Sequence, residues 1–148
     1  MGLLSPADQE KLRDSFAEMT RPVRVLFFTQ TLDCDTCVLT RQILDELPPL
    51  SDKIAIDELN VVIDADQARL YGIDRAPGIA LTYTDVDETA LKDSRIRFLG
   101  APSGYEFVSL VQALMLVGGA PSNLSKESRQ RLAEVDKPVT MQVFTTPT

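Results

Sequence analysis

Two cysteines with two residues between them, Cys34 and Cys37, are the side chains of this sequence best suited to covalent chemistry. They follow a β-branched and aromatic stretch, residues 23–29, and precede apolar residues with helical spacing, residues 38–47. A cysteine at the start of a helix faces unpaired backbone N–H groups and the positive end of the helix dipole, and both favour the nucleophilic thiolate. The second cysteine lies one helical turn further on, so the two sulfur atoms can close a disulfide. The spacing therefore indicates thiol–disulfide exchange.

The order of the two cysteines predicts their roles: Cys34 attacks and Cys37 resolves. Cys34 would attack a substrate disulfide to form a mixed disulfide, which Cys37 would then break to release the reduced substrate. Two other interpretations are a pair of unrelated buried thiols and a zinc site. Because the sequence has two cysteines and no histidine, a four-ligand zinc site would have to bridge two copies of the chain. We expect no metal and no cofactor.

Polar residues around Cys34 argue against a strongly oxidising site. Asp33 and Asp35 flank Cys34, and two carboxylates beside a thiol oppose the helix dipole and disfavour the thiolate. Thr36 retains the backbone N–H that a proline at this position would lack. The alternative is that both carboxylates point into solvent, which screens their charge.

Glu58 is a further carboxylate that could act on the cysteine pair. It has the same strand parity as Ile54 and Ile56, which places it on the predicted buried face. A carboxylate there could carry protons for Cys37. The alternative is a carboxylate at the end of a strand that reaches water.

The composition favours a single domain with a core of its own. The chain has 148 residues, of which 44% are hydrophobic. Its net charge of −7 argues against nucleic acid and anionic membranes as partners, because both bind basic surfaces. No run of about 18 apolar residues could span a membrane, and the first residues lack the basic and apolar regions of a signal peptide. We expect a cytoplasmic protein, in which a lone Cys-x-x-Cys is redox-active rather than a structural staple.

The pattern of apolar and turn residues predicts alternating helices and strands. Ser5 and Pro6 are typical of a helix start, and Pro48 and Pro49 end the helix that follows the cysteines. The first two strands should be parallel and the last two antiparallel, in a mixed sheet with helices on both faces. The predicted helices are residues 5–19, 38–47, 64–71 and 102–117, and the predicted strands are residues 23–29, 53–63, 78–84 and 95–100.

Three segments of the sequence carry a resemblance to a known family. They are the Cys-Asp-Thr-Cys motif after the first core strand, residues 71–77 before the third strand, and residues 98–107 leading into the last helix. These segments resemble the thioredoxin fold, and within it the tandem protein disulfide oxidoreductases related to glutaredoxin. The resemblance covers nearly the whole chain and implies an α/β protein with three layers, α/β/α, around a four-stranded mixed sheet. It also implies a cis Ala76–Pro77 peptide bond that faces the cysteines.

The resemblance further implies a substrate groove formed by Arg75, Ala76, Pro77 and Gly100. The backbone of Ala76 would pair with an extended segment of the substrate, as an edge strand does. Pro77 would keep metal ions away from the thiols, and Gly100 would form a third wall. From the residues alone, Pro77 could instead be a strand-starting proline. Arg75 could offset the carboxylates beside Cys34, guide an acidic substrate, or be a solvated cation.

The end of the chain repeats its beginning. Residues 124–135 are typical of a helix, and residues 137–146 begin Lys-Pro-Val and reach Phe-Thr, as residues 21–29 begin Arg-Pro-Val and reach Phe-Thr. A repeat separated by more than about 100 residues indicates a duplicated domain. We therefore predict a thioredoxin-like unit over residues 1–120, followed over residues 121–148 by a linker and the first helix and strand of a second unit, cut before its own cysteine motif. We expect this segment to be disordered or to pack on another molecule, for example in a dimer.

Two classes of function follow from these features. The first is an enzyme, a thiol–disulfide oxidoreductase that serves cell redox homeostasis. The resemblance implies disulfide-containing proteins as substrates and a flavoprotein similar to thioredoxin reductase as electron donor. The second is a docking or electron-relay module whose partner unit carries the main activity. Its analogue is the N-terminal region of the alkyl hydroperoxide reductase flavoproteins, in which one of two units lacks cysteines; the presence of both Cys34 and Cys37 favours the enzyme.

Overall fold

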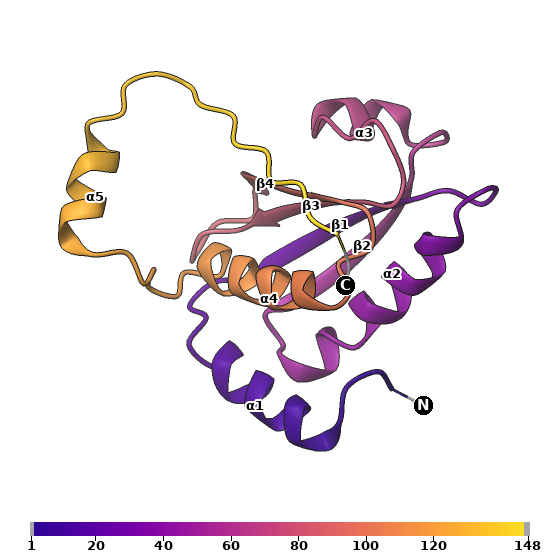
Figure 1. The fold of residues 1–148 in the computed structure, drawn as a ribbon, viewed down its shortest axis with the longest axis horizontal. Helices are drawn as coiled ribbons and strands as arrows, with labels where there is room; N and C mark the ends of the chain where they lie inside the picture. Colours follow the sequence, from indigo (N-terminus) through magenta and orange to yellow (C-terminus); the bar gives the residue numbers. More distant parts are fainter. Residues whose placement is uncertain (1, 147–148) are drawn as a thin grey trace.

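The computed structural model describes residues 2–146 and contains one four-stranded sheet with helices on both faces (Figure 1). The strands are β1 (Val23–Thr29), β2 (Ile54–Asn60), β3 (Gly78–Tyr83) and β4 (Lys92–Leu99). The helices are α1 (Pro6–Phe16), α2 (Asp35–Asp45), α3 (Ala65–Leu70), α4 (Tyr105–Val117) and α5 (Lys126–Ala133), and a short 3₁₀ helix, η1 (Pro48–Leu50), follows α2. Of the helices described, none is long and apolar enough to cross a membrane.

The strands lie in the order β2-β1-β3-β4. Strand β1 is parallel to β2 and antiparallel to β3, and β3 is antiparallel to β4. This confirms the predicted mixed sheet and the α/β class.

Strand β1 occupies the centre of the sheet, and all of its residues except Arg24 are buried. Neighbouring strands pair on both sides and helices cover both faces, which explains why its sequence is an almost unbroken apolar run. Phe27 lies opposite Glu58 of β2 and Ile79 of β3. The ends of β1 and β2 therefore meet the start of β3 at one edge of the sheet, and the cysteine motif follows β1 at this edge.

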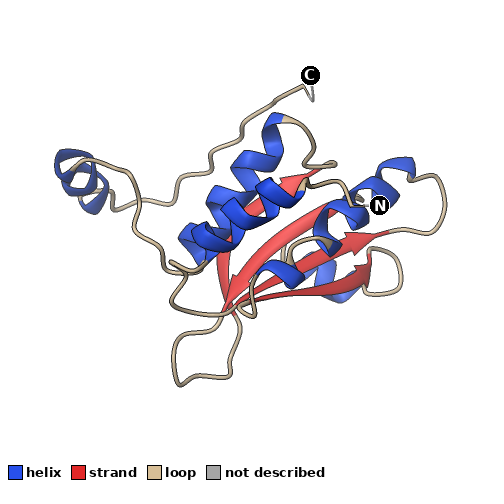
Figure 2. Cartoon of the chain, turned by 90° about the horizontal axis from the view of Figure 1, so that it is seen from below, coloured by secondary structure: helices blue, strands red, loops and turns tan. Residues whose placement is uncertain are grey.

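The two faces of the sheet pack against different helices (Figure 2). Helices α1, α2 and α4 cover one face, and α3 covers the other. The alternation of side chains along β1 sends residues 23, 25 and 27 to the first face and residues 26 and 28 to the second. The larger core includes Phe16, Phe27, Leu44, Ile79, Leu110 and Leu114, and the smaller core consists of Leu26, Phe28, Ala68, Ile73 and Ala80.

Two strand boundaries differ from the prediction. Strand β2 ends at Asn60 because its side-chain oxygen accepts hydrogen bonds from the backbone N–H groups of Val62 (2.9 Å) and Ile63 (3.1 Å), which turns the chain. Strand β4 begins at Lys92, earlier than predicted, and passes through a register shift where Arg95 has a φ of 66°. The prediction missed this start because the first residues of β4 are polar, as is common on an edge strand.

Helix α5 projects away from the rest of the chain, and the residues after it run back toward α4 (Figure 1). The helix predicted over residues 124–135 is confirmed as α5, which begins after Ser125; the Ser125 hydroxyl accepts a hydrogen bond from the backbone N–H of Ser128 (3.1 Å). Residues 137–146, predicted as the first strand of an incomplete second unit, form no strand in the described chain and run as irregular chain. A strand needs a neighbour for its backbone N–H and C=O groups, and the sheet contains only β1 to β4 within residues 2–146.

Candidate active site

A disulfide joins Cys34 and Cys37 at the first turn of α2, with Cα atoms 5.3 Å apart. Cys34 is the residue that precedes the helix, and its carbonyl accepts a hydrogen bond from the backbone N–H of Cys37 (3.1 Å). Cys34 is half-buried, whereas only 4% of Cys37 is exposed. Cys34 is therefore the more accessible of the two cysteines.

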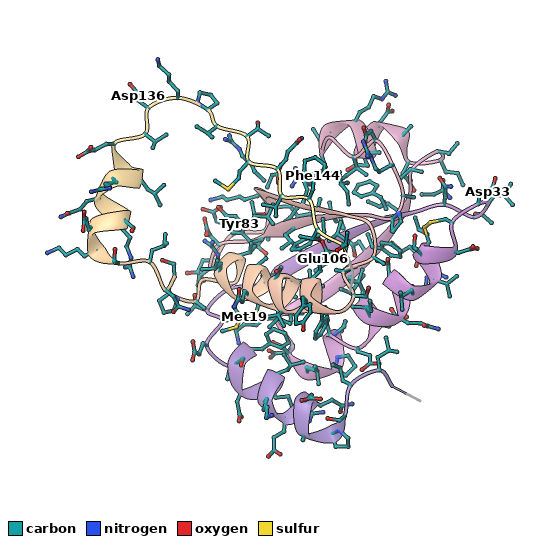
Figure 3. All side chains as sticks on the ribbon, in the orientation of Figure 1. Met19, Asp33, Tyr83, Glu106, Asp136 and Phe144 are labelled. Atoms are coloured by element: carbon teal, nitrogen blue, oxygen red, sulfur yellow. A yellow bond between two sulfur atoms is a disulfide. The ribbon has the colours of Figure 1, made fainter. Side chains whose placement is uncertain are left out.

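The loop that presents Cys34 is held by its own hydrogen bonds. The side-chain amide of Gln30 donates to the carbonyl oxygens of Leu32 (2.8 Å) and Asp33 (3.4 Å). Asp33 has a φ of 54°, a left-handed conformation that aspartate tolerates better than most residues other than glycine. Figure 3 shows Asp33 in this loop, at the opposite end of the molecule from Asp136.

The polar neighbours of Cys34 face solvent. Asp33, Asp35 and Thr36 are all exposed, so water and salt screen the two carboxylates. The carbonyl of Thr36 accepts a hydrogen bond from the buried hydroxyl of Thr40 (2.8 Å), which stabilises the first turns of α2. The influence of the two carboxylates on Cys34 stays a prediction.

A cleft of ≈ 370 Å³ lies beside the disulfide, on the side of strand β2. Both cysteines line it, together with residues of the loop after β1, of α2 and of the end of β2. They include Gln30, Cys34, Cys37, Val38, Arg41 and Glu58. The cleft thus brings Glu58 and Cys37 to one cavity.

Glu58 is exposed, however, and it is paired with Arg41. The Nε of Arg41 donates to Oε2 of Glu58 (2.8 Å), and a second nitrogen of the guanidinium contacts Oε1. Arg41 lies one turn beyond Cys37 on α2, so the ion pair crosses the cleft beside Cys37. Sequence reasoning missed Arg41; its position four residues after Cys37 on the helix was the available signal.

The other predicted site residues lie on the opposite side of β1, beside β3. Phe28 pairs with Gly78, so Pro77 reaches the same edge of the sheet as the cysteine motif. The Ala76–Pro77 peptide bond is cis, and the Pro77 carbonyl accepts a hydrogen bond from the backbone N–H of Gly100 (2.9 Å). Ala76 packs against the same core as Cys34. The structure therefore brings Ala76, Pro77 and Gly100 together at this edge.

Arg75 lies next to this group but its charge is already paired. Its guanidinium donates to both carboxylate oxygens of Asp74 (2.8 and 3.1 Å). The hydrogen bond from Arg75 lowers the pKa of Asp74, and the same bond raises the pKa of Arg75. Both side chains are exposed. Arg75 therefore contacts Asp74 rather than the carboxylates beside Cys34.

The chemically distinctive groups of the described chain are concentrated at the disulfide. Residues 2–146 contain no group of three or more His, Cys, Asp or Glu side chains that could hold a metal ion. Asp85, whose pKa is lowered by hydrogen bonds from Lys92 and Arg21, follows strand β3 and lies at the far edge of the sheet.

Known proteins similar in sequence to this chain are F subunits of alkyl hydroperoxide reductase (AhpF) from different bacteria. The chain is 35% identical over 121 residues to AhpF of Xanthomonas campestris pv. phaseoli, which covers 80% of this chain and 19% of that protein. It is 28% identical over 127 residues to AhpF of Escherichia coli K12, covering 85% of this chain and 21% of that protein. The chain spans about a fifth of the length of these relatives. No family model matches it.

Solved structures give the same relationship. The crystal structure of the NTD_N/C domain of AhpF from Enterococcus faecalis matches with a TM-score of 0.76 and 26% identity, over 87% of this chain and 59% of that one. A protein disulfide oxidoreductase from Aeropyrum pernix matches with a TM-score of 0.70 and 23% identity, over 88% of this chain and 54% of that one. This second likeness bears on the fold alone.

The sheet order, the Cys-x-x-Cys disulfide before α2 and the two sets of relatives agree with one another. They also agree with the resemblance found in the sequence. The chain has the thioredoxin fold with a Cys-x-x-Cys disulfide before α2, and it is similar to the F subunit of alkyl hydroperoxide reductase and to the N-terminal domain of that protein from Enterococcus faecalis.

Proposed function

We propose that this chain is a thiol–disulfide oxidoreductase that exchanges disulfides with other proteins in the cytoplasm and so serves cell redox homeostasis. The observation that carries the proposal is the unequal exposure of the two cysteines. Cys34 is half-buried and within reach of a partner, whereas Cys37 is 4% exposed. A mixed disulfide can form at Cys34 while Cys37 stays in place to resolve it.

The exchange proceeds in two steps. The Cys34 thiolate attacks one sulfur atom of the substrate disulfide, and the other substrate sulfur leaves as a thiolate and takes up a proton. Cys37 then loses its proton and attacks the sulfur of Cys34, so that the second substrate sulfur leaves. The substrate gains two electrons and two protons, and the chain is left with the Cys34–Cys37 disulfide. A flavoprotein similar to thioredoxin reductase is the proposed donor, returning two electrons through a dithiol of its own.

The surroundings of Cys34 favour a reductant over an oxidant. The backbone N–H groups at the start of α2 stabilise the Cys34 thiolate. The negative charges of Asp33 and Asp35 would destabilise this thiolate, and Thr36 keeps the backbone N–H that a proline would lack. The reduction potential should therefore lie nearer about −270 mV than about −120 mV. Titration of thiolate absorbance near 240 nm measures the underlying pKa of Cys34, and a midpoint below about 5 would contradict this assignment.

Glu58 is the proposed proton acceptor for Cys37. It lines the same cleft as Cys37, and Arg41 holds both of its carboxylate oxygens. The position of Glu58 is thus set while its exposure keeps it in exchange with water, as a proton carrier needs.

The groove formed by Ala76, Pro77 and Gly100 is proposed to hold an extended segment of the substrate. The hydrogen bond between Pro77 and Gly100 fixes two of its walls relative to each other. The backbone of Ala76 would pair with the substrate segment. Arg75, with Asp74 beside it, forms the charged end of this groove.

A second candidate function is a docking or electron-relay module within a longer protein. The similarity to about a fifth of AhpF favours it. On this proposal, residues 1–120 form one thioredoxin-like unit, and residues 121–148 supply the linker and the segments that would become the first helix and strand of a second one once the rest of that unit pairs with them. For this chain without a complete second unit, we propose that residues 121–148 can join two copies of the chain in a dimer.

Turnover and trapping distinguish these candidates. An oxidoreductase should catalyse the reduction of insulin by dithiothreitol, whereas a docking module should not accelerate it. Cys37→Ser should accumulate a mixed disulfide with insulin, because Cys34 can still attack, and Cys34→Ser should trap none. Equal trapping by both variants would contradict the assigned roles, and the double serine variant is the matched control.

A further inference from the structure

Four large apolar side chains are exposed on the segments that line the cleft beside the disulfide. The exposed fractions are 77% for Leu32, 58% for Val38, 74% for Val62 and 83% for Ile63. Leu32 lies in the loop after β1, Val38 on α2, and Val62 and Ile63 in the turn after β2, and each of these segments also contributes residues that line the cleft. We call these four residues the apolar collar.

The turn that carries Val62 and Ile63 of the collar is held by hydrogen bonds. The side-chain oxygen of Asn60 accepts hydrogen bonds from the backbone N–H groups of Val62 and Ile63, and the carboxylate of Asp64 accepts one from the backbone N–H of Asn60 (2.7 Å). The backbone N–H of Val61 donates to the carbonyl of Thr29 (2.9 Å), which ties this turn to β1. Apolar side chains held out into water in a group mark an interaction site.

The charges around the collar favour a basic partner. Asp33 and Asp35 are exposed on one side, and Asp64 lines the cleft on the other. Arg41 is the cation that lines the cleft, and its charge is paired with Glu58. The unpaired charges around the collar are therefore negative, which attracts basic side chains and repels acidic ones.

We propose that the apolar collar is the docking surface for a redox partner protein whose reactive cysteine is flanked by apolar and basic side chains. The inference rests on the proposed function and adds the partner class and the direction of its approach. The partner would approach over β2, whereas the groove of Ala76 and Pro77 lies on the β3 side of β1. The cleft admits a few side chains next to Cys34, and the collar supplies the apolar contact around them.

The test uses two peptides whose single cysteine carries a thionitrobenzoate group as a mixed disulfide. Both have leucines beside the cysteine; one adds lysines and the other glutamates. Cys34 of the reduced chain attacks the peptide sulfur and coloured thionitrobenzoate leaves; Cys37 then attacks Cys34 and frees the peptide thiol. The rate of colour release gives the rate constant, and cysteine with the same group but no peptide measures reactivity without docking.

The lysine peptide should react about tenfold faster than the glutamate peptide at low salt, and the difference should shrink at high salt. Val62→Ser combined with Ile63→Ser should slow the lysine peptide about tenfold, because two apolar contacts are lost. The rate with the labelled cysteine should change by less than about twofold. Val86→Ser is the matched control: Val86 is 66% exposed in the turn after β3, at the far edge of the sheet, and its loss should leave all rates unchanged.

Three results would overturn the collar as a docking surface. They are equal loss in the collar variant and the Val86 control, equal loss with the labelled cysteine, or faster reaction of the glutamate peptide. Failure of the proposed function is recognised separately, because then the unaltered chain neither reduces insulin nor releases colour from the labelled cysteine.

Discussion

One sequence pattern occurs twice in this chain, and its first copy is buried whereas its second copy is exposed. Val23, Val25 and Phe28 of β1 are 1%, 0% and 0% exposed, whereas Val139, Met141 and Phe144, at the matching positions of the repeat, are 74%, 84% and 90% exposed. Both segments follow a proline and end in Phe-Thr. The difference shows that an apolar β pattern becomes a buried strand only where other strands pair with it.

The boundary between the two regions lies at the end of α4. The buried hydrophobic side chains of the described chain all occur at or before Ala120. Gly118 still belongs to the packed unit, since its carbonyl accepts hydrogen bonds from the backbone N–H groups of Thr20 (2.8 Å) and Arg21 (3.1 Å). Beyond it, a hydrogen bond from the Thr145 hydroxyl to Glu106 (2.6 Å) joins the last described residues to α4. Figure 3 shows Phe144 near this point.

The largest expected effect is the difference in stability loss when one phenylalanine ring is removed from the buried copy and the matching ring from the exposed copy. Phe28→Ala should lower the free energy of unfolding by about 3–5 kcal/mol, because it leaves a cavity in the smaller core. Phe144→Ala should change it by less than about 0.5 kcal/mol, as for an exposed side chain. Urea titration of both variants measures the contrast. A comparable loss in Phe144→Ala would mean that the second copy is part of the first unit.

The next effect tests where the packed unit ends. Gly119 has a φ of 91°, and a Cβ atom there would lie 2.3 Å from the hydroxyl of Thr20. Gly119→Ala should therefore cost about 1–3 kcal/mol from backbone strain and crowding. Gly72→Ala is the control: Gly72 has a φ of 67°, but an added Cβ would meet open space, so this substitution introduces backbone strain without crowding. If Gly119→Ala cost no more than Gly72→Ala in thermal unfolding, the packed unit would end before residue 119.

A smaller effect concerns ion pairs in the two regions. Hydrogen bonds from Arg97 lower the pKa of Asp93 in the folded protein. A lowered pKa stabilises the fold above the usual carboxyl pKa, and this stabilisation is lost as the pH falls through the lowered value. Asp93→Asn should cost about 0.2–1 kcal/mol at pH 7, because the pair is partly exposed, and the cost should vanish in strong acid. Glu127→Gln, which breaks an exposed pair with Arg131 in α5, should leave stability unchanged across the same pH series.

The smallest effect is expected from removing the second region altogether. Deletion of residues 121–148 should leave a folded, redox-active monomer, because the described part of this segment is exposed throughout or nearly so. Sedimentation of the full chain and of the shortened chain would show whether this segment joins two molecules. Unfolding of the shortened chain would instead assign the segment to the core of the first unit and refute the duplication.

Features that depend on neighbours along the chain could be predicted from the residues alone. Ser5 was recognisable as a helix start, because a hydroxyl before a helix accepts a hydrogen bond from a backbone N–H within the next turn. The cysteine motif between β1 and α2 and the apolar run of β1 were likewise visible, since strand and helix have different periods. The proline before β3 and the glycine after β4 were predicted from the family resemblance.

Features that join segments far apart in the sequence appear only once the chain is folded. The ion pair of Arg41 and Glu58 beside Cys37 exists because α2 packs next to the end of β2, which no local pattern specifies. The polar start of β4 forms because β3 supplies its hydrogen bonds. Residues 137–146 have the pattern of a strand but no strand forms there, because pairing partners come from the fold and not from the pattern.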